Sequence, residues 1–308
     1  MNVSHEDDVA HLCDALEKRL QQLLPPCELH GAVYAAMRDA TLAAGKRMRP
    51  LLLLLAARDM GCDIDRSGVV DLACAVEMIH AASLVLDDMP SMDNAMQRRG
   101  RPTIHCQYGE NVAMLAAVSL LSQAFGVIAR APDLAPEVKS QASAALSVAI
   151  GHLGLAQGQF LDLSASHNSG DVEAIMLTNE LKTSSLFDAV LQIAAIAAGA
   201  QPLAREHLRS LAREMGQAFQ LMDDLADGLS HTGKDAHQDR DKKRVTLVAA
   251  LGAEVAYHRL CQHMRRADSH LLNACTAGRA TQRFIHAWFN KYAVFIGQQG
   301  PYSLSEAR

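Results

Sequence analysis

The sequence predicts an all-α protein, and three observations support this fold class. Hydrophobic residues make up 49% of the 308 residues and aromatic residues only 4%, so the core must consist of aliphatic side chains, which favours packed helices. Apolar residues recur at intervals of three and four along most of the chain. No useful length alternates with period two. We therefore expect one domain over residues 1–308, a bundle of ten or more helices around a central apolar cavity.

The first helices follow from spacing and from helix-breaking residues. Apolar residues at helical spacing predict a peripheral helix over residues 1–24, which a Pro-Pro pair ends. A second helix is predicted over Val33–Ala44, and Gly45 breaks it. The segment GKRMRP at 45–50 forms a turn, and a strongly apolar helix is expected from Leu51.

The remaining chain predicts further helices over its apolar segments. These segments are Gly68–Leu86, Tyr108–Ala129, Pro136–Leu163, Leu186–Gly199, Arg205–Asp227 and Ala249–Tyr292. Asp171 follows a polar loop and is expected to cap the next helix. The tail 301–308 is expected to fray.

Composition excludes several classes of protein. A net charge of −5 leaves no basic surface for nucleic acid. Seven scattered cysteines without a CxxC motif favour a reducing compartment, and the acidic N-terminus lacks a signal pattern. The most strongly apolar run, Leu51–Ala57, is shorter than the roughly 20 residues that span a bilayer. We expect a cytoplasmic protein without a transmembrane segment.

The stretch from His80 to His105 concentrates opposite charges. Asp87, Asp88 and Asp93 are followed directly by Arg98 and Arg99. Carboxylates this close repel one another unless a cation neutralises them, and Mg²⁺ prefers carboxylates together with water and phosphate. Arginine suits phosphate because its donors form a planar fork. The stretch predicts a site for metal and diphosphate, with a solvated acidic turn as the alternative.

Spacing places two further restrictions on this stretch. Asp93 lies six residues after Asp87 and cannot share its face on a regular helix, so the helix should distort near Pro90. His80 lies two helical turns before Asp87 on the same face. A histidine there is either an ordinary core residue or part of the site.

Two basic segments are candidate anion sites. Lys46, Arg47 and Arg49 lie in a turn that leads into a helix N-terminus, which favours a diphosphate. The alternative is a solvated loop. Lys182 and Thr183 are expected within a helix that continues into a buried segment, where the lysine either faces an anion or extends its charge to solvent.

A second acidic cluster lies in FQLMDDLAD. Asp223 and Asp227 stack one turn apart, an arrangement that destabilises a helix unless a cation bridges them. If the two clusters face each other, six carboxylates line one end of the bundle and hold Mg²⁺ against a diphosphate leaving group. The polar, lysine-rich segment 228–245 is typical of a mobile loop over a site.

Five motifs in order give a family resemblance: GKRMRP, DDMPSMD with RRGRP, KT, FQLMDDLAD and GKD. Over nearly its whole length the chain resembles bacterial trans-isoprenyl diphosphate synthases, most of all the geranylgeranyl diphosphate synthases of carotenoid biosynthesis. The resemblance implies the isoprenoid synthase fold, a homodimer, and Mg²⁺, three per active site, with Mn²⁺ able to substitute. It also implies condensation of isopentenyl diphosphate onto allylic diphosphates by ionisation, condensation and elimination.

The resemblance also implies roles for individual residues. Metal ligands, with Asp227 farthest from the metal, are Asp87, Asp88, Asp93, Asp223, Asp224 and Asp227. Residues for isopentenyl diphosphate are Lys46, Arg49, His80 and Arg99. Residues for the allylic diphosphate are Arg98, Lys182, Thr183, Gln220 and Lys234, and Lys182 is also implied to be catalytic. The family commonly has GKST where this chain has DKKRVT, so either Lys243 or Arg244 supplies that cation.

Product length is predicted from the residues one turn before Asp87. Ala82 and Ser83 are small and should form an early part of the tunnel floor. Relatives that stop at fifteen carbons often have an aromatic residue there, so a twenty-carbon product is expected. The alternatives are a farnesyl diphosphate synthase, a non-catalytic modulatory subunit and a generic Mg²⁺ phosphohydrolase. Terpene cyclases and head-to-head synthases do not need the second basic site.

Overall fold

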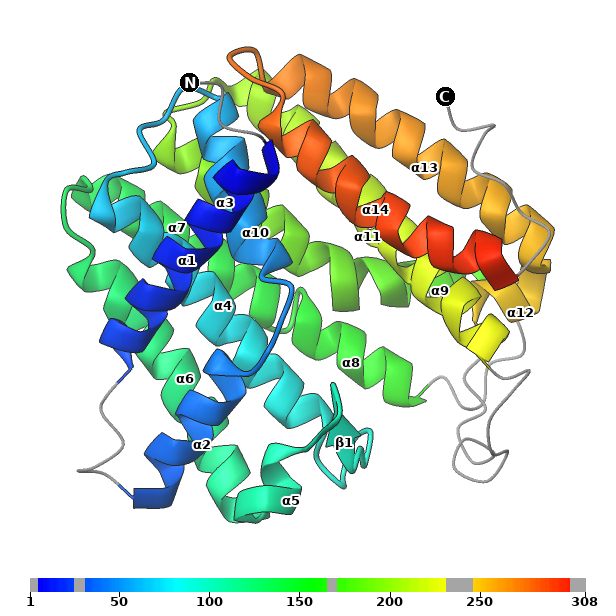
Figure 1. Ribbon diagram of the computed structural model, residues 1–308, viewed down its shortest axis with the longest axis horizontal. Helices are drawn as coiled ribbons and strands as arrows, with labels where there is room; N and C mark the ends of the chain where they lie inside the picture. Colours follow the sequence, from blue (N-terminus) through cyan, green and yellow to red (C-terminus); the bar gives the residue numbers. More distant parts are fainter. Residues whose placement is uncertain (1–4, 25–30, 165–170, 231–245, 300–308) are drawn as a thin grey trace. The chain divides into compact units, whose positions relative to one another are not determined.

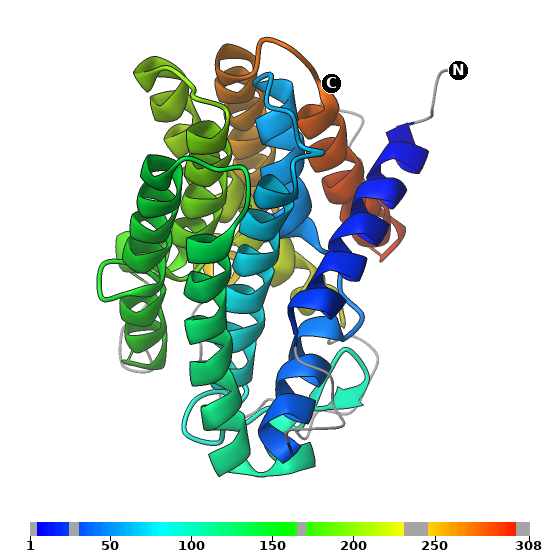
Figure 2. The same cartoon turned by 90° about the vertical axis from the view of Figure 1, so that its left-hand side faces the viewer.

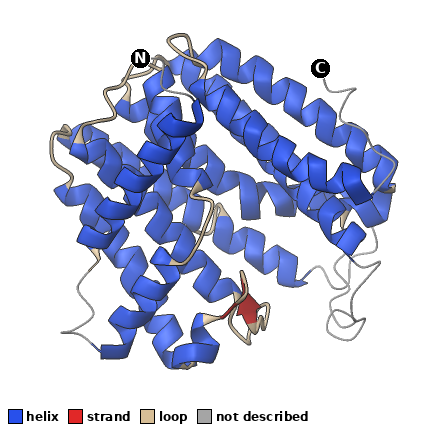
Figure 3. Cartoon of the chain, in the orientation of Figure 1, coloured by secondary structure: helices blue, strands red, loops and turns tan. Residues whose placement is uncertain are grey.

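The computed structural model describes residues 5–24, 31–164, 171–230 and 246–299. In this part of the chain the regular structure is helical apart from one two-stranded hairpin (Figure 3). The all-α prediction is therefore confirmed, and the described helices exceed the expected ten.

The contacts of the chain group it into two compact units. The first comprises Met1–Arg58, Cys62–Ser143 and Ile196–Ala198, and the second comprises Asp59–Gly61, Ala144–Ala195 and Gly199–Arg308. The chain passes between the units more than once. The expectation of a single domain over 1–308, with a central cavity, stays a prediction.

Helix α4 is the core of the first unit. Its side chains are buried on nearly every face, and it packs against α6, α1 and α2; α4 (cyan) and α6 (teal) run side by side in Figure 2. The helices that begin in this unit are α1 (His5–Leu23), α2 (Gly31–Leu42), α3 (Met48–Asp59), α4 (Ser67–Asp87), α5 (Ile104–Tyr108), α6 (Glu110–Arg130) and α7 (Pro136–Ile150).

Helix α11 is the longest element of the second unit and packs against α13 and α14 (Figure 1). The elements that begin in this unit are α8 (Leu155–Ser164), α9 (Val172–Asn179), the π-helical turn η3 (Glu180–Ser184), α10 (Ser185–Ala197), α11 (Pro202–Ser230), α12 (Leu247–Leu251), α13 (Ala253–Ala274) and α14 (Ala280–Gln299).

Several predicted boundaries are confirmed. The peripheral helix ends at Leu23, before the Pro-Pro pair, and the Asp171 carboxylate caps α9 by accepting from the backbone N–H groups of Glu173 and Ala174. Helix α3 begins at Met48 and not at Leu51. Since proline is tolerated in a first helical turn, Pro50 does not delay the helix.

The prediction of one helix over Pro136–Leu163 is wrong, because a turn between Gly151 and Gly154 divides it into α7 and α8. The Gly154 N–H donates to the Gly151 carbonyl at 3.0 Å. A Cβ on Gly154 would lie 2.2 Å from the carbonyl oxygen of Ala149, so the turn requires glycine there. Because apolar residues keep their helical spacing across this turn, the sequence pattern does not reveal the break.

The segment Ala249–Tyr292 is likewise divided, into α12, α13 and α14. The start of α14 is fixed by a distant residue: the buried Asp59 carboxylate accepts from the backbone N–H groups of Ala280 at 3.2 Å and Thr281 at 2.7 Å. A carboxylate at a helix N-terminus satisfies free N–H groups and the helix dipole. Local sequence holds no signal for this cap.

By length and composition alone, three described segments are apolar enough to cross a membrane: Ser67–Asp87, Glu110–Arg130 and Pro136–Ser164. Polar and small residues interrupt each one, so a search for uninterrupted apolar runs misses them. In the most apolar 18-residue stretch of each segment, 72%, 39% and 28% respectively is buried inside the protein. The first is thus a core helix, whereas the others keep apolar surface exposed. The expected absence of a transmembrane segment stays a prediction.

Candidate active site

The first acidic cluster lies where α4 ends. Asp87 is the last residue of the helix and Asp88 caps it. The chain then folds back, so that the Asp93 N–H donates to the Asp87 carbonyl at 2.9 Å and the Ala95 N–H donates to the Asp88 carbonyl at 3.2 Å. The predicted departure from a straight helix before Asp93 is confirmed. The fold-back brings the backbone of Asp93 beside that of Asp87.

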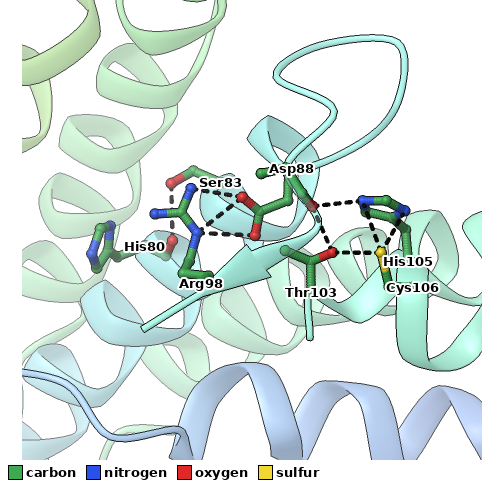
Figure 4. Close-up of polar contacts among 8 residues, drawn as sticks. His80, Ser83, Asp88, Arg98, Thr103, His105 and Cys106 are labelled. Carbon is green, nitrogen blue, oxygen red and sulfur yellow. Dashed lines mark hydrogen bonds and ion pairs between the residues drawn. The ribbon is translucent and has the colours of Figure 1, made fainter. Parts of the chain in front are cut away.

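The Asp88 carboxylate is paired with Arg98. Arg98 Nε lies 2.9 Å from both carboxylate oxygens, and Nη2 lies 2.7 Å from Oδ1 (Figure 4). The Asp88 side chain is 5% exposed and that of Arg98 is 37% exposed. Asp88 thus holds Arg98 in one orientation, on a side chain that stays partly exposed.

A hairpin that the sequence did not predict separates the two neighbouring arginines. Strands β1 (Gln97–Arg98) and β2 (Arg101–Pro102) pair antiparallel, with Arg98 opposite Arg101. The connecting residues Arg99 and Gly100 have φ of 54° and 75°, as a type I′ turn requires. Arginine is uncommon in this conformation, and such strain is typical of functional sites.

The turn directs Arg99 toward the basic segment before α3. Arg99 Nη1 donates to the Ala44 carbonyl at 3.0 Å. A Cβ on Gly45 would lie 2.7 Å from the same nitrogen, so glycine leaves room for the guanidinium. Beside it, Arg49 Nη1 lies 3.3 Å from His80 Nε2. The structure therefore brings Arg49 together with His80, and Arg99 to the turn before α3. The role that the resemblance implies for these residues stays a prediction.

The remaining cations of this turn differ in environment. Lys46 is exposed at its edge. Arg47 is buried, and its guanidinium donates to the Glu77 carboxylate at 2.6 Å. Of the three cations in GKRMRP, Lys46 is exposed and Arg49 half-buried, whereas Arg47 is buried. The assignment of Lys46 and Arg49 to a substrate stays a prediction. Sequence reasoning did not single out Glu77.

His80 is held neutral. Burial lowers the pKa of His80 well below its usual value, and the positive charges of Arg49, Arg99, Arg98 and Arg47 lower it further. A neutral imidazole accepts a hydrogen bond through one ring nitrogen. Nε2 therefore accepts from Arg49, and His80 orients that guanidinium without adding charge to the cluster.

This depressed pKa predicts how stability depends on pH. Below about pH 6.5, His80 binds a proton more readily in the unfolded chain than in the folded protein. The free energy of unfolding therefore falls as the pH falls. The contribution is at most about 1.4 kcal/mol per pH unit. Urea unfolding at pH 7.5 and pH 5.5 should show a larger loss in the wild type than in His80→Gln. Equal losses in both proteins would contradict this prediction.

The loop after the first cluster is anchored at Ala95. Thr103 Oγ1 donates to the Ala95 carbonyl at 2.8 Å, and His105 Nε2 lies 3.0 Å from the same oxygen (Figure 4). Since the Ala95 N–H is bonded to the Asp88 carbonyl, these contacts fix the loop on the end of α4. Thr103 and His105 of the motif RPTIH thus hold the loop that follows the acidic cluster against the end of α4.

Lys182 and Thr183 lie in η3 and not in a regular helix as predicted. The Ser185 N–H donates to the Glu180 carbonyl, the i to i+5 bond of a π-turn, and such turns are frequent at functional sites. Lys182 Nζ contacts Asp162 Oδ2 on α8 at 2.5 Å. Lys182 therefore faces the carboxylate of Asp162, a residue to which the sequence analysis gave no role.

The second acidic cluster lies on α11. Asp223 and Asp224 are half-buried, and Gln220 Nε2 donates to Asp224 Oδ1 at 3.0 Å. Gln220 and Asp224 thus share a face of the helix. Asp227 is also on α11, but its side chain lies outside the described residues.

Other predicted residues fall in segments that the structure does not describe. Lys234, Lys243 and Arg244 lie within 231–245, and the tail 301–308 lies within 300–308. Their assignments stay predictions.

A family model for polyprenyl synthetases matches residues 30–274. The chain belongs to the polyprenyl synthetase family. A geranylgeranyl diphosphate synthase of Pantoea ananas is 55% identical over 285 residues, which are 92% of this chain and 94% of the relative. A geranylgeranyl diphosphate synthase of Pseudescherichia vulneris is 48% identical over 94% of each chain. An apo FPP/GFPP synthase of Zymomonas mobilis has a TM-score of 0.81 at 29% identity, covering 94% of this chain and 99% of its own. The family resemblance and the isoprenoid synthase fold are confirmed.

Each acidic cluster of this polyprenyl synthetase, taken by itself, offers carboxylates of the kind that Mg²⁺ binds. In the part of the chain that the structure describes, no three His, Cys, Asp or Glu side chains gather closely enough to hold a metal by themselves. Mg²⁺ is commonly bound by one or two carboxylates and completed by water and substrate phosphate. Asp87 at the end of α4 and Asp223 on α11 are carboxylates of this kind. The metal assignment of all six aspartates stays a prediction.

Proposed function

We propose that this prenyltransferase is a geranylgeranyl diphosphate synthase, which condenses isopentenyl diphosphate with allylic diphosphates until the product has twenty carbons. The observation that supports it most is a basic group formed by Arg49, His80 and Arg99, whose contacts differ from those of the Arg98–Asp88 pair. Two anion sites in one unit suit an enzyme with two diphosphate substrates. The two bacterial relatives described above, 55% and 48% identical to this chain, are named geranylgeranyl diphosphate synthases.

Different residues are proposed to bind the two diphosphate substrates. Arg49, oriented by His80, and Arg99 bind isopentenyl diphosphate with Lys46 at the edge. Arg98 presents its exposed donors to the allylic diphosphate while Asp88 holds its other side. Bound Mg²⁺, with Mn²⁺ as a substitute and three ions per site, would neutralise the leaving diphosphate. The buried apolar wall of α4 would exclude water from the cation.

The quaternary state that we propose is a homodimer. Met114, Leu115 and Val118 form an apolar stripe on α6 and are 49%, 55% and 64% exposed. A second copy of the chain that packs on this stripe would remove its apolar surface from water, so no membrane is needed to cover it. Sedimentation equilibrium should give about twice the 33.2 kDa chain mass.

We also propose a cytoplasmic location and supply of the product to carotenoid biosynthesis.

Product analysis with labelled isopentenyl diphosphate tests the activity. Dimethylallyl, geranyl and farnesyl diphosphate are each supplied with Mg²⁺, and the products are separated by chromatography. A twenty-carbon product from every primer supports the proposal, and a chelator should stop elongation until Mg²⁺ is restored. Products that end at fifteen carbons would identify a farnesyl diphosphate synthase.

Two further outcomes would overturn the catalytic proposal. Release of inorganic phosphate without elongation would identify a phosphohydrolase. If the protein does not elongate a primer by itself but changes the product of an active synthase with which it is mixed, it is a modulatory subunit.

Product length should depend on Ala82, which is completely buried on α4. Ala82→Tyr adds an aromatic ring to the proposed tunnel floor and should shift the main product from twenty to fifteen carbons. Ser83 is half-buried, and its Oγ donates to the His80 carbonyl at 2.9 Å, so Ser83→Phe should have the same effect. Ala73→Tyr, which also enlarges a buried alanine of α4, is the control for nonspecific damage. An unchanged product profile in Ala82→Tyr would contradict the tunnel model.

A further inference from the structure

Arg47 lies between two proposed substrate-binding residues, yet it has a different environment. It is 4% exposed, and its backbone has φ of 46°. Nη1 donates to the Thr41 carbonyl at 2.9 Å, and Nη2 donates to the Ala43 carbonyl at 3.1 Å. A non-glycine residue keeps a left-handed backbone only where its surroundings impose it. Here the guanidinium fork binds the end of α2 and folds the turn around itself.

The third partner of Arg47 connects this turn to α4. Nη1 lies 2.6 Å from Glu77 Oε1, and both side chains are almost completely buried. Glu77 is three residues before His80, so the two side chains share a face of α4. Two contacts therefore join this region to α4: Arg47, in the turn before α3, to Glu77, and Arg49, in the first turn of α3, to His80.

Glu77 also supplies negative charge beside a group of cations. Burial lowers the pKa of Arg99, Glu77 opposes this effect, and the charges of Arg98 and Arg47 add to it. Without Glu77, Arg47 would keep only its longer contact with Glu17, where Nε lies 3.5 Å from Oε1 of a carboxylate side chain that is 46% exposed. Its buried charge would then be poorly compensated, which is strongly unfavourable. The turn would then relax, and its exposed cations would move.

We propose that Arg47 and Glu77 are a positioning pair, which holds residues 44–49, the turn and the start of α3, on α4 so that Lys46 and Arg49 meet isopentenyl diphosphate together with His80 and Arg99. This inference rests on the proposed function. Neither member of the pair touches the substrate, because the donors of Arg47 are directed at the protein. The pair should affect one substrate and not the other.

Glu77→Gln tests the proposal, and α4 offers a matched control. Asp71 is another buried carboxylate on this helix, and it pairs with Arg19 at 2.6 and 3.0 Å. Glu77→Gln and Asp71→Asn each remove one buried negative charge at constant shape. Steady-state kinetics are measured with isopentenyl diphosphate and geranyl diphosphate varied separately, together with thermal unfolding.

We expect Glu77→Gln to raise the KM for isopentenyl diphosphate about 10- to 100-fold, the effect of a lost hydrogen bond between charged groups. Its KM for geranyl diphosphate and its kcat should stay within about 3-fold of the wild type, below the tenfold effect of one such bond. Asp71→Asn should lower thermal stability but leave both KM values unchanged. If Glu77→Gln does not fold, Arg47→Lys replaces it, since lysine keeps the charge but cannot reach all three acceptors.

Equal changes in both KM values, or an unchanged KM for isopentenyl diphosphate in the folded variant, would overturn the positioning role. The proposed function would then still stand, because the wild type would elongate its primer. A wild type that does not elongate would overturn the proposed function itself.

Discussion

Asp87→Ala should reduce kcat by about 10³-fold or more, the scale expected when a group that stabilises transition-state charge is removed. Asp87 is the last residue of α4, and the backbone of Asp93 folds back onto its carbonyl. If Mg²⁺ binds there, loss of this carboxylate weakens the ion that neutralises the leaving diphosphate. Initial rates over a range of Mg²⁺ concentrations measure the effect, and half-saturation should also move to higher Mg²⁺.

Thermal unfolding separates this effect from a loss of structure. Asp87 is adjacent in sequence to Asp88 and close to Asp93, so removing one of these negative charges should leave stability unchanged or slightly increased. Glu137→Ala, at an exposed position in the first turn of α7, serves as the control and should keep the wild-type rate. An Asp87→Ala enzyme within about tenfold of the wild-type rate would contradict an essential metal ligand at this position.

Asp88 illustrates how far sequence can assign a role. The acidic motif predicts that Asp87 and Asp88 are equivalent, because both are carboxylates in one cluster. The structure distinguishes them: both oxygens of Asp88 accept from Arg98. Which carboxylate meets an arginine depends on the Arg99-Gly100 turn, and an arginine at positive φ has no strong sequence signal.

Helices were predicted where periodicity is strong, and errors occur where tertiary contacts decide the backbone. Asp59 caps α14 from far away in the sequence, and a close approach of Gly154 to Ala149 ends α7. Neither contact changes the apolar period that identifies a helix. Glu77 was missed for the same reason, since a single glutamate on an apolar helix does not reveal that its partner is Arg47.

The π-turn η3 is the clearest case of a site feature hidden from sequence. The KT motif predicted that Lys182 and Thr183 are functional, but only the packing of neighbouring helices shows why the turn is wider than an α-helix. Gly158 on α8 and Gly216 on α11 both face η3 at close range. Small residues on two sides let η3 lie against both helices.

Gly158→Ala should therefore damage both the fold and the site. The added Cβ would lie 2.3 Å from the backbone nitrogen of Lys182 and 2.7 Å from the carbonyl carbon of Leu181. Backbone atoms cannot move aside as a flexible side chain can, so we expect a loss of about 1–3 kcal/mol or more from overpacking. Because η3 must shift from α8, Lys182 should also lose its contact with Asp162.

The shift of Lys182 should appear in kinetics as a higher KM for the allylic diphosphate, with a smaller change for isopentenyl diphosphate. Gly126→Ala is the matched control, because its Cβ would meet only the end of the Arg130 side chain at 3.1 Å. In the interior of α6 that change should be neutral or stabilise by up to about 1 kcal/mol. If Gly158→Ala unfolds at the wild-type temperature and keeps both KM values, α8 does not press on η3, and the position of Lys182 must depend on its ion pair with Asp162 alone.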